Sequence, residues 1–170
     1  MKSKTLTPLS HGAPQHCFGC GETNRSGLRL RFFVDNQQVV CHARLARRFE
    51  GPPGHAHGGV IATLLDEAMS KANRLHDVVA MTRQMEIEYL RPVPLGNALT
   101  VTGRRVSHEG RRNYCEAEIA SESGEVLARG KAVFIAVDRS VCSDSERRTH
   151  DESPDTGWSR KAGCREPANA

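Results

Sequence analysis

The sequence predicts an α+β fold in which one long helix packs against a single antiparallel sheet. Residues 57–72 are the only good match to helical periodicity, with apolar residues at three- and four-residue spacing. The segments before and after them alternate apolar and polar residues, as half-buried strands do. Because no β-α-β alternation is present, a doubly wound parallel sheet is disfavoured.

The predicted helix follows a breaker-rich loop, Gly51–Gly54. Asp66 falls well away from the apolar stripe, on a strip of small residues that could face another subunit, whereas Glu67 falls on a strip that we expect to be solvated. Asp66 is therefore the carboxylate expected in a semi-enclosed site. A buried helix with a glycine-rich start and a surface acidic pair is the alternative interpretation. The apolar stripe consists of Val60, Ile61, Leu64, Leu65, Ala68, Met69 and Ala72.

Strands are expected on both sides of this helix. Two precede it, over Leu28–Val34 and Val39–Leu45, with a turn at residues 35–37 between them. Pro92 and Pro94 end the first strand after the helix. That strand and the next three are predicted to form a meander, over residues 85–89, 99–106, 114–120 and 126–137. We expect about five to six strands in the sheet.

Length and composition limit the class of protein. A chain of 170 residues predicts one domain, expected over residues 16–137 between a flexible N-terminus (1–15) and a disordered tail (138–170). The net charge of +4 is too weak and dispersed to indicate a nucleic-acid partner. No apolar run approaches the ~18 residues of a membrane span, and residues 1–15 lack the apolar core of a secretory signal. We therefore expect a cytoplasmic protein with no membrane partner.

The chain has six cysteines, which we expect to be reduced. Cys17 and Cys20 form a C-x-x-C pair beside His16, but a metal site needs two more ligands and no second such pair exists. Cys41 and His42 would contribute only if the fold brought them close. Inert thiols are the favoured interpretation, with a structural metal and a redox pair as alternatives. No metal and no cofactor is predicted.

The start of the helix offers hydrogen-bond donors. Gly58 and Gly59 have no Cβ, so another group can approach their backbone closely. The first N–H groups of a helix have no partner within it, and the helix dipole adds partial positive charge there. A carbonyl or an oxyanion is the kind of group that such a position binds.

The motif His57-Gly58-Gly59, with Asp66 nine residues after the histidine, resembles that of the hotdog-fold acyl-CoA thioesterases. The closest branch is the PaaI-type and thioesterase-superfamily-member group. Ala80–Pro92 resembles the strand that follows the helix in that group, where a Ser or Thr precedes an apolar alternation and a proline. Cys17–Gly21, followed by Gly27-Leu28, resembles an N-terminal signature of bacterial members. The resemblance covers about residues 16–137.

The resemblance implies a hotdog fold and an assembly, a homodimer or a homotetramer, with active sites between subunits. Asp66 would be the catalytic carboxylate, as nucleophile or as general base, and the N–H of Gly58 or Gly59 would polarise the thioester carbonyl. Thr82, from the partner subunit, would hold or orient the attacking water. His57 would either brace the loop or contact the substrate. The other expected substrate-binding residues are Gly59, His55, Met81, Arg83 and Arg91, of which Arg91 is the first choice for the phosphates of CoA.

One position departs from the family pattern. Some relatives carry an Asn several residues before the His-Gly-Gly motif, where it helps to orient water, and residues 50–55 contain none. Glu50 or His55 would then substitute for it, or Asp66 and Thr82 would suffice.

The expected activity is hydrolysis of acyl-CoA thioesters to free CoA and a carboxylic acid. The alternative is a non-catalytic acyl-CoA-binding module. Asp66 argues against that alternative, because a pure binder gains nothing from a desolvated carboxylate. A hotdog hydratase or dehydratase would need a His and a carboxylate in a different spacing, which we do not find.

Overall fold

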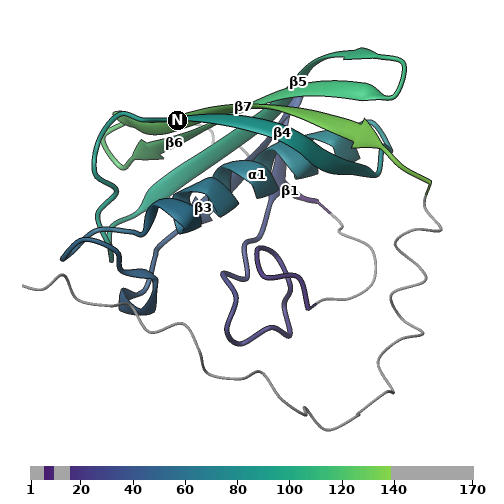
Figure 1. Cartoon of the computed structure of the whole chain (residues 1–170). Helices are drawn as coiled ribbons and strands as arrows, with labels where there is room; N and C mark the ends of the chain where they lie inside the picture. The colour runs from purple at the N-terminus through teal and green to yellow at the C-terminus, as the bar shows by residue number, and fades with distance from the viewer. Residues whose placement is uncertain (1–5, 10–15, 139–170) are drawn as a thin grey trace, which may run out of the picture. The chain divides into compact units, whose positions relative to one another are not determined.

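The structure, a computed structural model, describes residues 6–9 and 16–138 (Figure 1). One long helix, α1 (Gly58–Arg74), lies across one face of a single antiparallel sheet. This arrangement confirms the α+β prediction. The described elements also include a short 3-10 helix, η1 (Arg47–Phe49). The strands are β1 (Thr7–Pro8), β2 (Phe33–Asp35), β3 (Gln38–Ala43), β4 (Ala80–Tyr89), β5 (Leu99–Glu109), β6 (Arg112–Ser121) and β7 (Val126–Ala136).

The sheet order is β1-β2-β3-β5-β6-β7-β4. Its seven strands exceed the expected five to six, and the short β1 was not anticipated. The meander prediction holds for β5, β6 and β7 but is wrong for β4, which pairs with β7 and forms an edge of the sheet. The connection after β4 is bound to the segments before α1, because the Val93 carbonyl accepts from the Ala56 N–H and the Gly96 N–H donates to the Leu45 carbonyl. The chain therefore crosses to β3 before β5 begins.

Much of the first predicted strand is absent. Residues 28–32 are not a strand, and β2 begins only at Phe33. Arg29 has a φ of 50°, which interrupts extended backbone. The N–H groups of Leu28 and Leu30 instead donate to the carbonyls of Phe18 and Gly19. The segment before β2 is therefore bound to the loop that carries Cys17 and Cys20.

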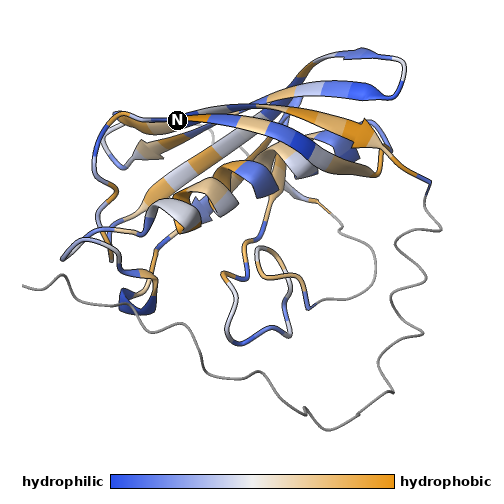
Figure 2. Cartoon of the chain, viewed as in Figure 1, coloured by the Kyte–Doolittle hydropathy of each residue, from blue (hydrophilic) through white to orange (hydrophobic). Residues whose placement is uncertain are grey.

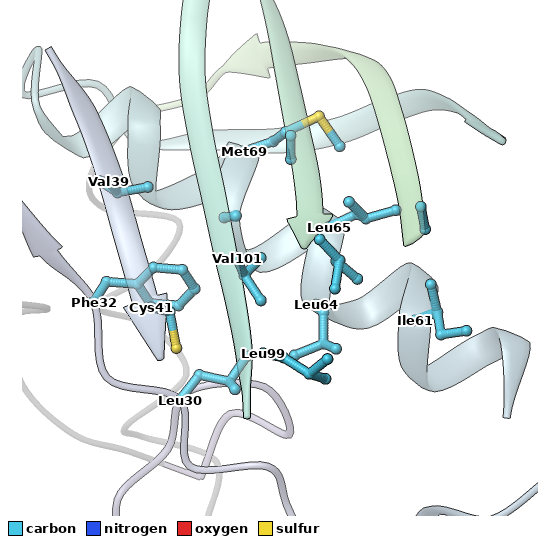
Figure 3. Packing of buried hydrophobic residues seen from close by; sticks show 14 of the residues in the cluster. Leu30, Phe32, Val39, Cys41, Ile61, Leu64, Leu65, Met69, Leu99 and Val101 are labelled. Carbon is cyan, nitrogen blue, oxygen red and sulfur yellow. The ribbon is translucent and has the colours of Figure 1, made fainter. Parts of the chain in front are cut away.

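The core lies between α1 and the inward face of the sheet (Figure 3). The buried stripe of the helix is confirmed for six of its seven predicted residues, and the seventh, Val60, is only partly buried. The six are each 5% exposed or less: Ile61, Leu64, Leu65, Ala68, Met69 and Ala72. Val39, Val101 and Phe134 meet them from the strands. Burying one such leucine contributes roughly 1.5–3 kcal/mol. Figure 2 shows the matching alternation of hydrophobic and hydrophilic residues along the strands.

Two predictions about the other faces of the helix are wrong. The strip expected to face another subunit runs beside Asp66 through Ala62, Met69 and Asn73, where Met69 borders the apolar stripe. Asn73 is fully buried in the core of its own chain, as Met69 is, so this part of the strip does not face another subunit. Glu67, expected in solvent, has a side chain only 12% exposed, because the loop of residues 17–21 packs against that face. Periodicity identified the polar strip but not the loop that covers it.

Gly103 allows the helix to approach β5 closely. A Cβ at this position would lie 2.6 Å from the carbonyl carbon of Ala68 and closer still to its oxygen, and a helix backbone cannot move aside cheaply. Gly103→Ala is expected to lower the free energy of unfolding by about 2–3 kcal/mol, a fall of roughly 4–12 °C in Tm. Gly130→Ala is the matched control, since its nearest neighbours would be 3.4 Å away or more. Equal Tm values for the two variants would contradict this packing.

No helix within the described residues is long and apolar enough to cross a membrane. The tail predicted over residues 138–170 lies outside them, apart from Asp138, and so do residues 1–5 and 10–15 of the predicted N-terminal segment.

Candidate active site

The central feature of the site is a short hydrogen bond between α1 and β4. The Thr82 hydroxyl donates to Asp66 Oδ1 at 2.6 Å. Both residues belong to the same chain, so the expectation that Thr82 comes from the partner subunit is wrong for this contact. The other oxygen of Asp66, Oδ2, accepts no hydrogen bond within the described residues.

A β-bulge in β4 brings Thr82 to the helix side of the sheet. Thr82 pairs with Phe134, but the next registered pair is Gln84 with Val133, so Arg83 is the extra residue. The bulge changes which residues face α1, since Thr82 before it and Met85 after it both pair with buried residues of β7. Without the extra residue, one of the two would point away from the helix.

The environment of Asp66 changes its acidity. Burial raises the pKa of this carboxyl above its ordinary value, and the negative charge of Glu67 raises it further, while the hydrogen bond from Thr82 acts in the opposite direction. A raised pKa makes a carboxylate a stronger base. Asp66 is therefore suited to accept a proton from water or to attack a carbonyl carbon.

The start of α1 has one unused donor. His57 is the N-cap, and its Nδ1 accepts a hydrogen bond from the Gly59 N–H at 3.0 Å. Gly59 therefore cannot offer that N–H to a substrate, contrary to one of the two expected assignments. The Gly58 N–H donates no hydrogen bond within the described residues. The Gly58 N–H is thus the backbone donor that remains available at the start of α1, and in this structure His57 caps the helix.

His57→Ala is expected to lower the free energy of unfolding by about 1 kcal/mol, because it removes the cap of the helix. His57→Asn should retain most of that stability, because an asparagine side chain also accepts from the N–H groups of the first helical turn. Chemical denaturation of the two variants and the wild type measures the difference. A direct catalytic role of the imidazole would instead appear as lost activity in His57→Asn at unchanged stability.

The loop before the helix is held by its own hydrogen bonds. Glu50 Oε1 accepts from the Gly54 N–H at 2.7 Å, and His55 Nδ1 lies 2.9 Å from the Pro53 carbonyl oxygen. Neither side chain contacts Asp66 in this structure. Glu50 and His55, the two expected replacements for the family's Asn, both use their side chains to hydrogen-bond within this loop.

Tyr89 is a site residue that the sequence analysis missed. Its hydroxyl donates to the Gly58 carbonyl at 3.3 Å, and its ring is 3.8 Å from where a Cβ on Gly58 would lie. The signal was present in the sequence, since Tyr89 continues the alternation of Met85 and Ile87 toward the helix. Tyr89 is 55% exposed and lies against the first residue of α1.

The remaining candidates lie on or after β4 and are exposed. Met81 is 50% exposed, next to Thr82. Arg83 occupies the bulge and makes no ion pair within the described residues. Arg91, which the sequence analysis favours as the phosphate-binding residue, forms an ion pair with Glu125, with Nε 3.4 Å from Oε1. Of these two arginines, only Arg83 has no acidic partner among the described residues.

A cavity of about 530 Å³ lies elsewhere, on the sheet face away from α1. Its lining includes the ion pairs Arg104–Glu116 at 2.9 Å and Arg129–Glu88 at 2.7 Å. Charged side chains paired across strands favour a stable polar surface over an acyl pocket. The cavity does not include Asp66 or Thr82, so we place the candidate site on the helix side.

The similarity to known proteins covers the part of the chain that contains the candidate site. The family model of the thioesterase superfamily matches residues 53–128, which include α1 and β4. Acyl-coenzyme A thioesterase THEM4 of Xenopus laevis is 30% identical over 100 residues, covering 58% of this chain and 45% of THEM4. The chain thus covers less than half the length of this relative.

Solved structures share the fold. A thioesterase superfamily protein is 32% identical, with a TM-score of 0.68 over 71% of this chain and 60% of its own. PaaI of E. coli, from the phenylacetic acid degradation operon, is 20% identical, with a TM-score of 0.61. The match covers 65% of this chain and 81% of PaaI.

A hypothetical thioesterase of Streptococcus pneumoniae TIGR4, solved with coenzyme A, is 22% identical, with a TM-score of 0.57 over 59% and 81% of the two chains. Two further structures of that protein carry single alanine substitutions, one of an aspartate and one of a threonine 16 positions later. Residues 53–128 of the present chain are therefore similar to the thioesterase superfamily domain, and the described residues share the hotdog fold of these proteins.

Proposed function

We propose that this protein hydrolyses acyl-CoA thioesters to free CoA and a carboxylic acid. The observation that carries the proposal is the 2.6 Å hydrogen bond from Thr82 to the partly buried Asp66, whose pKa is raised. The THEM4 similarity and the coenzyme A bound to the S. pneumoniae protein support this substrate class. The aspartate and threonine replaced in that protein are 16 positions apart, as Asp66 and Thr82 are.

The proposed reaction uses the two oxygens of Asp66 differently. Oδ1 is held by Thr82, which leaves Oδ2 for the reacting molecule. As a general base, Oδ2 takes a proton from water, the resulting hydroxide adds to the thioester carbon, and the C–S bond breaks as the CoA sulfur leaves with a proton. As a nucleophile, Oδ2 itself adds to that carbon, the C–S bond breaks to release the CoA thiolate, and water hydrolyses the resulting anhydride, which restores the carboxylate and releases the acid. In both routes the carbonyl oxygen becomes an oxyanion, which a backbone N–H stabilises.

The site requires residues from two copies of the chain. Gly58 and Asp66 are eight positions apart on α1, a rise of about 12 Å at 1.5 Å per residue. A thioester carbonyl whose oxygen is hydrogen-bonded to Gly58 therefore cannot also present its carbon to Asp66 of the same chain. In our proposal Asp66 of one subunit faces Gly58 of the other, in a homodimer with two equivalent sites.

The edge strand β4 is the proposed contact between copies. As the last strand in the sheet, it has one row of backbone groups without a strand partner in the described chain. Exposed apolar side chains accompany it: Met81, Tyr89 and Leu90. Light scattering on the purified protein is expected to give at least twice the mass of one chain, and a strict monomer that retains activity would contradict the shared site. Pairing of dimers into a homotetramer gives four times that mass.

Thr82→Val is expected to lower kcat for acyl-CoA hydrolysis by about 10–100-fold. The change keeps the shape of the side chain but removes the donor that fixes Asp66, so the carboxylate loses its orientation. Thr82→Ser retains the hydroxyl and should keep most of the rate. Steady-state kinetics of both variants test this role, and equal rates for the valine and serine variants would exclude it.

The function itself is tested by CoA release from short, long and aromatic acyl-CoAs, followed with a thiol reagent. Turnover on at least one substrate class is expected. Tight binding of acyl-CoA without any thiol release would instead support the non-catalytic binding module.

A further inference from the structure

A second cluster of reactive side chains lies at Glu67, the residue that follows Asp66 on α1 and points to a neighbouring face of the helix. The ligand atoms of Cys17, Cys20 and Glu67 lie within 4.8 Å of one another, and Cys17 Sγ donates to Glu67 Oε1 at 3.2 Å. Within the described residues no other group of three His, Cys, Asp or Glu ligand atoms lies this close together. The proposed thioesterase reaction uses none of the three side chains.

The backbone holds the cysteine loop against the helix. The Gly21 N–H donates to the Cys17 carbonyl at 2.9 Å, which closes a turn around the C-x-x-C pair. Gly19, inside that turn, approaches Glu67 so closely that a Cβ would collide with its side chain. The hydrogen bonds from Leu28 and Leu30 fix the same loop from the other side. The two thiols are therefore positioned by structure, and not only by their spacing in sequence.

One polar atom in the cluster is not satisfied. Glu67 Oε2 is buried and accepts no hydrogen bond within the described residues. Its charged neighbour is Lys71, 3.6 Å away, with a side chain 11% exposed. A buried carboxylate oxygen without a hydrogen bond costs free energy, so such atoms usually mark a missing partner.

We propose that Cys17, Cys20 and Glu67 bind a thiophilic divalent cation, with Zn²⁺ as the natural candidate. Two thiolates and one carboxylate match the ligands and the C-x-x-C spacing that zinc uses. Tetrahedral zinc with these bond lengths needs ligand atoms about 3.5–3.8 Å apart. The ligand atoms of the three residues lie within 4.8 Å of one another, so the longest separation exceeds that range by about 1 Å at most. Water occupies the fourth position.

The charges of the occupied site balance. Two thiolates and the Glu67 carboxylate carry three negative charges, and a divalent cation with the Lys71 ammonium carries three positive ones. A metal ion binds the thiolate form of cysteine and not the thiol. Binding therefore releases thiol protons, and the affinity rises with pH. The bound cation would fasten the loop that precedes β2 to the middle of α1.

Cobalt titration of the full chain tests the site. The protein is prepared with Cys142→Ser and Cys164→Ser, which remove the two other thiols outside the described residues, then reduced, stripped with a chelator and titrated with Co²⁺. We expect one Co²⁺ per chain, with a thiolate-to-cobalt absorption band in the near ultraviolet that Zn²⁺ abolishes. Cys17→Ser and Cys20→Ser should lose the band, and Glu67→Gln should weaken binding by at least about tenfold. Cys115→Ser, a buried thiol elsewhere in the core, is the matched control and should keep the band.

A second measurement needs no variant and so does not depend on how the variants fold. In the wild-type chain, Zn²⁺ should slow alkylation of Cys17, which is exposed, as measured by mass spectrometry of the labelled peptide. The proposal is overturned if stoichiometric Co²⁺ gives no thiolate band, if the band persists in Cys17→Ser and Cys20→Ser, or if Zn²⁺ leaves the alkylation of Cys17 unchanged. None of these readouts depends on thioesterase activity.

Discussion

Asp66→Asn is expected to lower kcat for acyl-CoA hydrolysis by about 10²–10⁴-fold, the contribution typical of a general base. If the carboxylate acts as the nucleophile, the loss is larger still. Asparagine has nearly the same shape, and its side-chain oxygen still accepts the hydrogen bond from Thr82. The variant should therefore fold normally and bind substrate, so the loss appears in kcat and not in KM.

Steady-state rates of CoA release, with circular dichroism as a check on folding, measure this effect. Glu122→Gln is the control, because Glu122 lies in the exposed turn between β6 and β7. It removes one carboxylate charge without touching the site. A folded Asp66→Asn protein with the wild-type rate would exclude Asp66 from the chemistry. Glu67, the other carboxylate of the pair, would then be the next candidate for the catalytic carboxylate.

Gly58→Pro is expected to lower kcat by about 10²–10³-fold, as removal of one oxyanion donor typically does. Gly58 is the first residue of α1, a position at which proline is well tolerated because its missing N–H has no partner in the helix. His57 before it is extended, with φ −63° and ψ 139°, which is the conformation that a following proline requires. The substitution thus deletes the proposed donor while preserving the helix.

Gly58→Ala is the matched control for that substitution. Alanine keeps the N–H, and its Cβ would meet only Tyr89, at an ordinary contact distance of 3.8 Å. We expect Gly58→Ala to retain most of the activity, and both variants to unfold at similar temperatures. Equal loss of kcat in the two would indicate that the added side chain, and not the missing N–H, causes the effect.

The sequence was sufficient to predict those elements whose structure follows from a single periodic pattern of apolar residues. The stripe from Ile61 to Ala72 predicted both the helix and its buried face, because each of these positions is apolar and the spacing fits one side of a helix. The alternation of Met85, Ile87 and Tyr89 likewise predicted an amphipathic strand. Helical periodicity singled out Asp66, the resemblance added Thr82, and the structure places the two side chains in direct contact.

Features that depend on contacts distant in sequence were not predictable in this way. The bulge at Arg83 decides that Thr82 faces α1, yet nothing in the local pattern of residues distinguishes a bulge from a regular strand. The placement of β4 beside β7 depends on the path of the chain after Pro92. Glu67 has the sequence surroundings of a solvated residue, and only the packing of a loop some 50 positions earlier buries it.

The most direct test of the shared catalytic site uses a mixed dimer of Gly58→Pro and Asp66→Asn chains, purified with two different affinity tags. If Asp66 of one subunit acts with Gly58 of the other, one of the two sites in the mixed dimer contains both intact residues. The mixed dimer should then recover about half of the wild-type kcat, although each parent variant is nearly inactive. A mixed dimer no more active than its parents would show that the two residues do not act on one substrate across the interface, and would contradict the proposed site.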